Sequence, residues 1–174
     1  MPIYALGVHE PRIHRTAFVH PDAVVIGSVV IGAEATLWPG AVLRGDHGGS
    51  IEVGARTSIQ DGTVLHTTQD WPTIIGDECV VGHNTHLEGY TVEDRCLIGS
   101  GSVTLNRAVV RTGAVVGAAA LIPEDFEVPS HSMALGVPAR IRQARIKAEW
   151  LDFAVQSYVD AGIRYTRELR RVDR

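Results

Sequence analysis

The chain is poor in residues that cross-link a small protein or anchor it in a membrane. Among its 174 positions are two cysteines, one lysine and few aromatic residues, and no apolar stretch reaches the length of a membrane-spanning helix. Two cysteines cannot make a disulfide framework, so Cys79 and Cys96 are expected to be reduced packing residues. The N-terminus lacks the charged and then apolar pattern of a signal peptide, which predicts a cytoplasmic protein.

An excess of charge of one sign is also missing. The formal net charge is −4, and acidic and basic residues are interspersed along the chain. Nucleic acids and membrane surfaces attract clustered basic residues, so we expect neither as a partner. The length is that of a single domain.

What the sequence does contain is a beat of six residues. A β-favouring residue, nearly always aliphatic, returns sixteen times, and a small or apolar residue stands two positions before almost every one. The sixteen are Val25, Ile31, Leu37, Leu43, Val53, Ile59, Leu65, Ile75, Val81, Leu87, Val92, Ile98, Thr104, Val110, Val116 and Ile122. Strand alternation sends both positions of each pair to the same side of the backbone.

This period predicts an all-β fold, a parallel β-helix with the shape of a triangular prism. The aliphatic residue fills the interior, the small residue allows the chain to turn a corner, and three hexads close one coil. Sixteen hexads therefore predict about five coils. Prisms of the hexapeptide class wind left-handed, against the usual handedness of parallel crossovers.

Three steps depart from the beat. From Leu43 to Val53 and from Leu65 to Ile75 the step is ten residues, which predicts corner loops at residues 45–50 and 67–72. The step from Leu87 to Val92 is five residues and shortens one side of its coil.

The two ends of the chain lack the beat. Residues 1–22 are expected to form an irregular lead-in with one strand, and residues 134–140 to cap the prism. Residues 143–171 are expected to form an α-helix along a prism face, weakened by Gly162 by about 1 kcal/mol. We therefore predict one domain, with the β-helix and its cap in residues 1–142 and the helix region in residues 143–174. The predicted apolar stripe of the helix is Ile146, Trp150, Ala154, Tyr158, Ala161, Tyr165 and Leu169.

The long steps bring polar residues into one column. Arg44, His66 and Glu88 are 22 residues apart and each follows an inward leucine, so all three point outward from one face in successive coils. Gln60 and Asp61 lie on the preceding face. His83 also belongs to that face, and one chain cannot easily bring it to His66 and Glu88. Two chains side by side can, which predicts a site shared between subunits of a closed ring, most simply a homotrimer.

These residues carry a resemblance that covers nearly the whole chain from about residue 12. The chain resembles the γ-class carbonic anhydrase family, whose fold is a trimeric left-handed β-helix. The motifs that carry the resemblance are Trp38-Pro39-Gly40-Ala41-Val42-Leu43-Arg44-Gly45-Asp46, Gln60-Asp61-Gly62-Thr63-Val64-Leu65-His66, Val81-Gly82-His83 and Gly136-Val137-Pro138-Ala139-Arg140.

The resemblance implies Zn²⁺, or Fe²⁺ or Co²⁺ in some members, held by three histidines from two subunits. His66 and His83 match two of these ligands. Arg44 and Asp46 match an ion pair between subunits, and Gln60 and Asp61 match polar residues beside the metal. By this resemblance, catalysis is expected to depend on Arg44, Asp46, Gln60 and Asp61.

The third ligand departs from the family. Glu88 stands where the family usually has histidine, followed by Gly89 as in the family. Three readings stay open. Glu88 completes a His₂Glu set, which is ordinary for zinc; His86 takes its place through an altered backbone; or the site is weakened or empty.

The expected activity is reversible hydration of CO₂ to bicarbonate. A divalent ion with an open position lowers the pKa of bound water from about 15.7 toward 7. A carboxylate ligand makes the metal a weaker Lewis acid, and the loop after Asp46 lacks the acidic insertion of the most active family members, so slow hydration is expected. The alternatives are a non-catalytic metal-binding or assembly homologue, a CoA-dependent hexapeptide acyltransferase, and a metal-dependent thioesterase.

Overall fold

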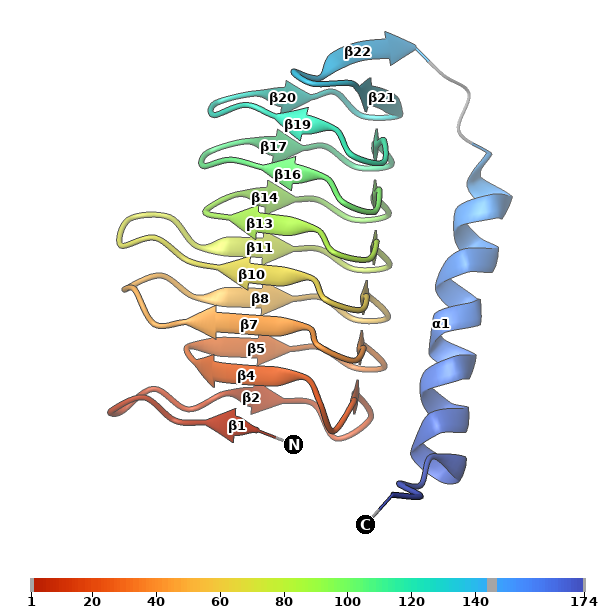
Figure 1. The fold of residues 1–174 in the computed structure, drawn as a ribbon. Coiled ribbons are helices and arrows are strands. Elements are labelled where there is room, and N and C mark those ends of the chain that lie inside the picture. Colours follow the sequence, from red (N-terminus) through yellow and green to blue (C-terminus); the bar gives the residue numbers. More distant parts are fainter. Residues whose placement is uncertain (1, 144–146, 174) are drawn as a thin grey trace.

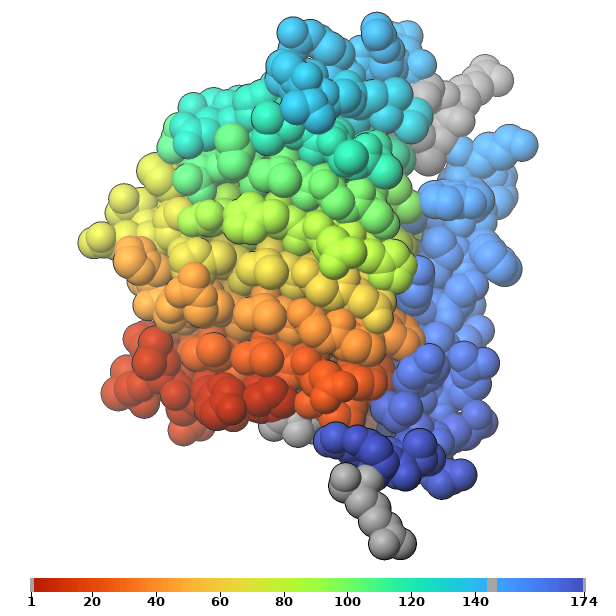
Figure 2. All heavy atoms as spheres, viewed as in Figure 1, coloured from red at the N-terminus to blue at the C-terminus, as the bar shows by residue number. Residues whose placement is uncertain are grey.

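The repeats form a left-handed parallel β-helix, and one α-helix returns along its side. The computed structural model describes residues 2–143 and 147–173. Coils stack from the N-terminal end, and the C-terminal helix α1 (Ala148–Glu168) runs back along the stack, so the last turn of α1 lies beside the first coils (Figure 1). In the space-filling view the coils appear as bands, with α1 against their flank (Figure 2).

Three sheets form the faces of the prism, and their strands are in register from coil to coil. Face 1 contains β1 (Ile3–Tyr4), β4 (Val24–Gly27), β7 (Val42–Gly45), β10 (Val64–His66), β13 (His86–Glu88), β16 (Val103–Thr104) and β19 (Leu121–Ile122). Face 2 contains β2 (Arg12–Ile13), β5 (Val29–Ile31), β8 (Ile51–Val53), β11 (Thr73–Ile75), β14 (Thr91–Val92), β17 (Val109–Val110) and β20 (Glu127–Val128). Face 3 contains β3 (Phe18–Val19), β6 (Thr36–Leu37), β9 (Ser58–Ile59), β12 (Val80–Val81), β15 (Leu97–Ile98), β18 (Val115–Val116), β21 (Ser132–Leu135) and β22 (Arg140–Gln143).

The interior is built from the residues that carry the beat. All sixteen are at most 3% exposed. Burial of an aliphatic side chain of this size contributes about 1.5–3 kcal/mol, so the column of inward residues is the main stabilising element. Cys79 and Cys96 are free, fully buried thiols in the same interior, which confirms their packing role.

The predicted number of coils was too low, because each face has at least seven strands and the helix therefore has about seven coils. The residues taken for an irregular lead-in form a complete first coil, β1 to β3. Its ten-residue step from Ile3 to Ile13 and its partly exposed side chains hid the beat. At the other end, Val128 and Ala134 continue the beat into the cap.

The interruptions of the beat lie where they were predicted. Residues 46–50 and 67–72 form loops between β7 and β8 and between β10 and β11, and both project beyond the neighbouring coils (Figure 1). The five-residue step places Tyr90 inside the prism, where its side chain is 2% exposed. Burial raises the pKa of the Tyr90 hydroxyl well above its ordinary value.

Helix α1 packs on face 3, but with a different side from the one predicted. Its buried residues are Leu151, Val155, Val159 and Gly162, whereas Trp150 is 54% and Leu169 45% exposed. The two tyrosines of the predicted stripe do pack, each edge-on to Trp38. They lie at the edge of the buried side, so the predicted stripe is displaced from the buried side by one residue. Ile146 lies outside the described residues.

A ladder of alternating charges holds α1 against the prism. Each of its residues stands at the same corner one coil after the last, and its two arginines reach the helix. The ladder consists of Glu34, Arg56, Glu78 and Arg95, with Gln156 and Asp152 as partners on α1. These side chains are a third to a half exposed, so solvent screens the ladder and apolar packing contributes more to docking.

Gly162 is required by this packing. A Cβ atom at this position would lie 2.7 Å from Thr36 Cγ2 and 3.2 Å from Phe18 Cβ, closer than normal contact. We expect Gly162→Val to lower the free energy of unfolding by about 1–3 kcal/mol through overpacking. Ser157→Val, at an exposed position of the same helix, should change it by no more than about 0.5 kcal/mol. Urea denaturation of both variants checks this, and equal effects would contradict the close approach.

Among the residues that the structure describes, there is no helix with the length and apolar character needed to cross a membrane.

Candidate functional site

The predicted polar column is present on face 1. Leu43, Leu65 and Leu87 point into the prism from β7, β10 and β13 and are fully buried. The next residues of these strands pair in register, Arg44 with His66 and His66 with Glu88. The ten-residue steps therefore preserve the face, as the sequence predicted.

His66 lies at the centre of a chain of polar contacts. Its Nε2 is 3.0 Å from Asp46 Oδ1, and the other oxygen of Asp46 accepts a hydrogen bond from Arg44. Burial raises the pKa of the Asp46 carboxyl, but the hydrogen bonds and charges of Arg44 and His66 outweigh burial and bring that pKa below its ordinary value. Asp46 is therefore an anion that fixes one side of the His66 ring.

Glu88 lies between two histidines. Its Oε1 is 3.4 Å from His66 Nδ1, and its Oε2 is 3.4 Å from His86 Nε2. His86 projects from the same face but belongs to the adjacent column, in register with Val64 and Val103. The in-register neighbour of His66 is thus Glu88.

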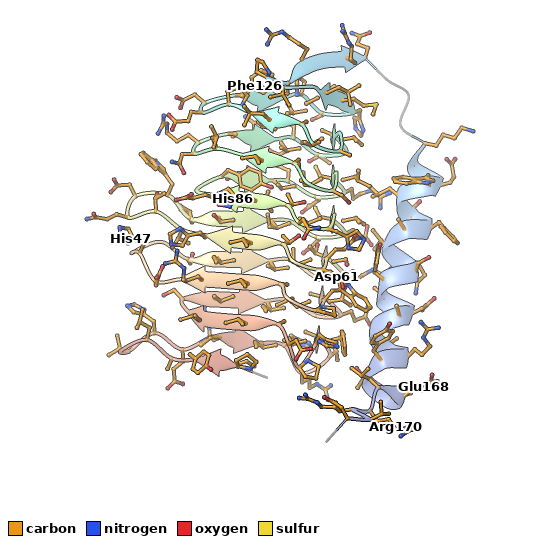
Figure 3. The ribbon with its side chains drawn as sticks, in the orientation of Figure 1. His47, Asp61, His86, Phe126, Glu168 and Arg170 are labelled. Carbon is orange, nitrogen blue, oxygen red and sulfur yellow. The ribbon has the colours of Figure 1, made fainter. Side chains whose placement is uncertain are left out.

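His83 lies in the turn between β12 of face 3 and β13 of face 1, just after the face on which the sequence placed it. Its Nδ1 is 2.9 Å from Asp61 Oδ2, and half of its side chain is exposed. In Figure 3 Asp61 lies beside α1, while His47, which follows Asp46, lies at the far edge of the prism. Within one chain the His83 pair and the His66 cluster are therefore separated.

Gln60 is buried next to this corner, at 4% exposure. Tyr158 of α1 lies beside Gln60 and Asp61. Burial and the charge of Asp61 raise the pKa of the Tyr158 hydroxyl, and the polar side chain of Gln60 opposes them. The C-terminal helix thus contacts the polar residues predicted to flank the metal.

The donor atoms suit a tetrahedral metal ion, although one chain does not supply enough of them. Within residues 2–143 and 147–173, no group of three or more His, Cys, Asp or Glu side chains is placed to hold an ion. Ligand atoms about 2.1 Å from a tetrahedral ion are about 3.4 Å apart. The separation of His66 Nδ1 and Glu88 Oε1 equals this value and is long for a hydrogen bond.

Three residues near the site carried no signal in the sequence as functional residues. The sequence marks Tyr158 only as part of the predicted apolar stripe. It marks His47 only as a residue of a predicted loop, but the ring centroid of His47 is 6.4 Å from that of His66. Thr73 continues the small-residue position of the beat, yet its hydroxyl bonds to the His66 backbone. The sequence hints at this contact of Thr73 only by placing a polar side chain at an inward position.

The outward column beside the polar column is apolar except at His86. Its members are half-buried and stand in register on six successive strands. They are Val24, Val42, Val64, His86, Val103 and Leu121. An apolar sheet face of this extent indicates a surface that packs against protein.

The fold and the repeat define a hexapeptide-repeat β-helix protein. Residues 10–45 match the bacterial transferase hexapeptide (six repeats) family. The γ-carbonic anhydrase 1 of Arabidopsis thaliana, a mitochondrial protein, is 39% identical over an alignment of 153 positions that covers 84% of this chain and 55% of that protein. The carnitine operon protein CaiE of Escherichia coli O157:H7 is 34% identical, with 99% of this chain and 92% of that protein covered. The chain therefore belongs to the γ-carbonic anhydrase-like family of hexapeptide-repeat proteins.

The solved structures that it resembles have the same fold. A Bacillus cereus protein provisionally called an acetyltransferase has a TM-score of 0.91 at 30% identity, with 94% of this chain and 95% of that chain covered. A hexapeptide transferase family protein from Anaplasma phagocytophilum has a TM-score of 0.89 at 32% identity, with 94% and 98% covered. The chain spans only slightly more than half the length of the Arabidopsis γ-carbonic anhydrases it matches.

Proposed function

We propose that the protein is a γ-carbonic anhydrase-type metalloprotein that hydrates CO₂ slowly at sites between the subunits of a homotrimer. His66 and Glu88 of one subunit and His83 of the next would hold the ion, with Zn²⁺ as the first candidate and Fe²⁺ or Co²⁺ as alternatives. The observation that carries the proposal is the in-register pair of His66 and Glu88, with donor atoms 3.4 Å apart.

Each histidine is oriented by a carboxylate, as metal-binding histidines usually are. Asp46 contacts His66 through Nε2, which leaves Nδ1 beside Glu88 for an ion. Asp61 contacts His83 through Nδ1, which leaves Nε2 free to reach a neighbouring subunit. Arg44 balances the charge of Asp46, and buried Gln60 supports the His83 corner.

A bound divalent ion with an open position supplies hydroxide near neutral pH for attack on CO₂. Glu88 adds a negative charge that a third histidine would not, which makes ionisation of the bound water harder. The loop that follows Asp46 is His47-Gly48-Gly49-Ser50 and offers no carboxylate to carry protons away. Both features support a slow enzyme.

The apolar outward column of face 1 supports the trimer. In a closed ring, this face of one subunit would pack against the His83 corner of the next, covering the valines and completing each site. Light scattering at micromolar concentration should return the mass of three chains. A monomer would contradict both the trimer and the shared site.

The activity is tested on the purified protein by metal analysis and stopped-flow CO₂ hydration. We expect about one metal ion per chain and hydration that is lost on chelation and regained on adding Zn²⁺. Metal without hydration would favour a non-catalytic metal-binding homologue. Absence of metal from a protein that was purified without chelators and then incubated with Zn²⁺ would exclude the proposal.

A second candidate is acyl transfer from CoA, supported by the two similar structures named as transferases. Such an enzyme uses a histidine base and needs no metal, so acetyl-CoA turnover that survives chelation would favour it. Turnover of a CoA ester to free acid that requires the metal would instead favour a thioesterase.

A cytoplasmic location also remains a prediction, supported by two cysteines that are free thiols. Cell fractionation with an antibody against the protein tests it.

A further inference from the structure

One buried hydroxyl connects the two coils that carry His66 and Glu88. Thr73, the first residue of β11, is fully buried at the corner between faces 1 and 2. Its Oγ1 donates a hydrogen bond of 2.5 Å to the carbonyl oxygen of His66 and accepts one of 2.9 Å from the amide of Gly89. The hydroxyl therefore joins the backbone of one predicted ligand to the residue after the other.

The Gly89 peptide is enclosed on its other sides too. The position that a Cβ atom would take lies 3.3 Å from Trp71 Cβ and 3.4 Å from Thr68 Cγ2, so the loop of residues 67–72 lies against it. Trp71 is in turn covered by the guanidinium of Arg107, 4.7 Å from the ring centroid. With the loop on one side and Thr73 on the other, the end of β13 has little freedom to move.

We propose that Thr73 is a positioning residue that sets the separation of His66 and Glu88 for metal binding. The inference rests on the proposed function, because it assumes that these two side chains share an ion. Without the hydroxyl, the buried Gly89 amide loses its partner, and β13 is free to shift relative to β10. A shift of a few tenths of an ångström matters, since ligand distances in metal sites are held to about 0.2 Å.

The chain contains a matched control. Thr57 is also fully buried, and its Oγ1 donates 2.7 Å to the carbonyl oxygen of Gly76 and accepts 3.0 Å from the amide of Cys79. This hydroxyl also makes one bond to a carbonyl oxygen and one from an amide and links its coil to the next, although both partners lie in that next coil, and it touches neither His66 nor Glu88. Thr57→Val and Thr73→Val therefore each remove a buried hydroxyl that makes two backbone hydrogen bonds, and only the second lies at the predicted site.

The test is Co²⁺ titration of the metal-free full chain, followed by visible absorption. Thr73→Val should bind Co²⁺ about 10–100-fold more weakly and alter its absorption band, as expected when a group that orients a ligand is lost. Thr73→Ser keeps the hydroxyl and should bind like the parent, and so should Thr57→Val. Parent-like binding by Thr73→Val, or equal weakening in both valine variants, would overturn the proposal. If Thr73→Val does not fold, Thr73→Ala replaces it with the same expectations.

A second measurement needs no metal. Hydrogen exchange of the peptide spanning residues 86–90 should be faster in Thr73→Val than in the parent and unchanged in Thr57→Val. If the parent itself binds no Co²⁺, the proposed function fails, and exchange alone decides whether Thr73 fixes β13. Unchanged exchange in Thr73→Val would then reject the role of Thr73.

Discussion

Glu88→Gln should lose most of its metal while the prism stays folded. The substitution removes the negative charge and leaves a neutral amide, which is a poor ligand for zinc. The affinity should fall by more than the ~10–100-fold typical of losing a group that only orients a ligand. Leu87, the inward neighbour of Glu88, is untouched, so the thermal unfolding midpoint of the metal-free protein should stay near that of the parent. Metal analysis after gel filtration gives the occupancy.

Glu88→His supplies the complementary result. It supplies the three-histidine ligand set that the resemblance implies and removes one negative charge from the ligands of the ion. The pKa of bound water should then fall, and CO₂ hydration near pH 7 should exceed that of the parent. His86→Ala is the matched control, because His86 Nε2 lies as close to Glu88 as His66 does. Metal retained in Glu88→Gln but lost in His86→Ala would identify His86 as the ligand.

Arg44→Ala should loosen the trimer and lower metal occupancy. In one chain the Arg44 side chain is 44% exposed and that of Asp46 is 22% exposed, and packing of face 1 against a neighbour would bury both. Removing one partner of a buried ion pair typically costs about 3–5 kcal/mol, because the other charge stays without compensation. Asp46 would also be less well held against His66. Sedimentation velocity over a dilution series, with metal analysis of each sample, measures both effects.

Arg111→Ala is the control for Arg44→Ala. Arg111 is likewise an arginine in an ion pair, in its case with two carboxylates, Glu93 and Glu127, but it follows β17 of face 2, away from the proposed interface. Its loss should leave the trimer intact. A fully metallated trimer in Arg44→Ala at every concentration would show that Arg44 is only a surface residue.

The features predicted well from the sequence are those that repeat. Each coil imposes the same demand on its inward residues, so register carries from Leu43 to Leu65 to Leu87 and fixes which residues follow outward. The first coil was missed because its step from Ile3 to Ile13 and its exposed edge weaken the pattern. The buried side of α1 was predicted one residue away from its true place because Tyr158 and Tyr165 pack at its margin. The spacing of apolar residues does not reveal the shape of face 3, against which they pack.

The site shows the same division. Alternation and spacing predicted that Arg44, His66 and Glu88 form a column. They could not predict that Asp46 would turn back to His66, that Tyr158 would reach Gln60, or that Thr73 would bond to two backbones. These contacts join residues through loops and corners, where side-chain geometry rather than periodicity decides the partner.

The docking of α1 has a consequence for the length of the prism. One turn of an α-helix advances about 5.4 Å, whereas successive coils are about 4.8 Å apart. Leu151 and Val155 meet Val80 on β12, and Gly162 meets Phe18 on β3, three coils away. Over three turns and three coils the two spacings come to differ by about 1.8 Å, more than a third of a coil. Because the two spacings differ, the side chains of α1 match those of face 3 in only one docking register. A coil added or removed within this span would leave the beat intact but put α1 out of step.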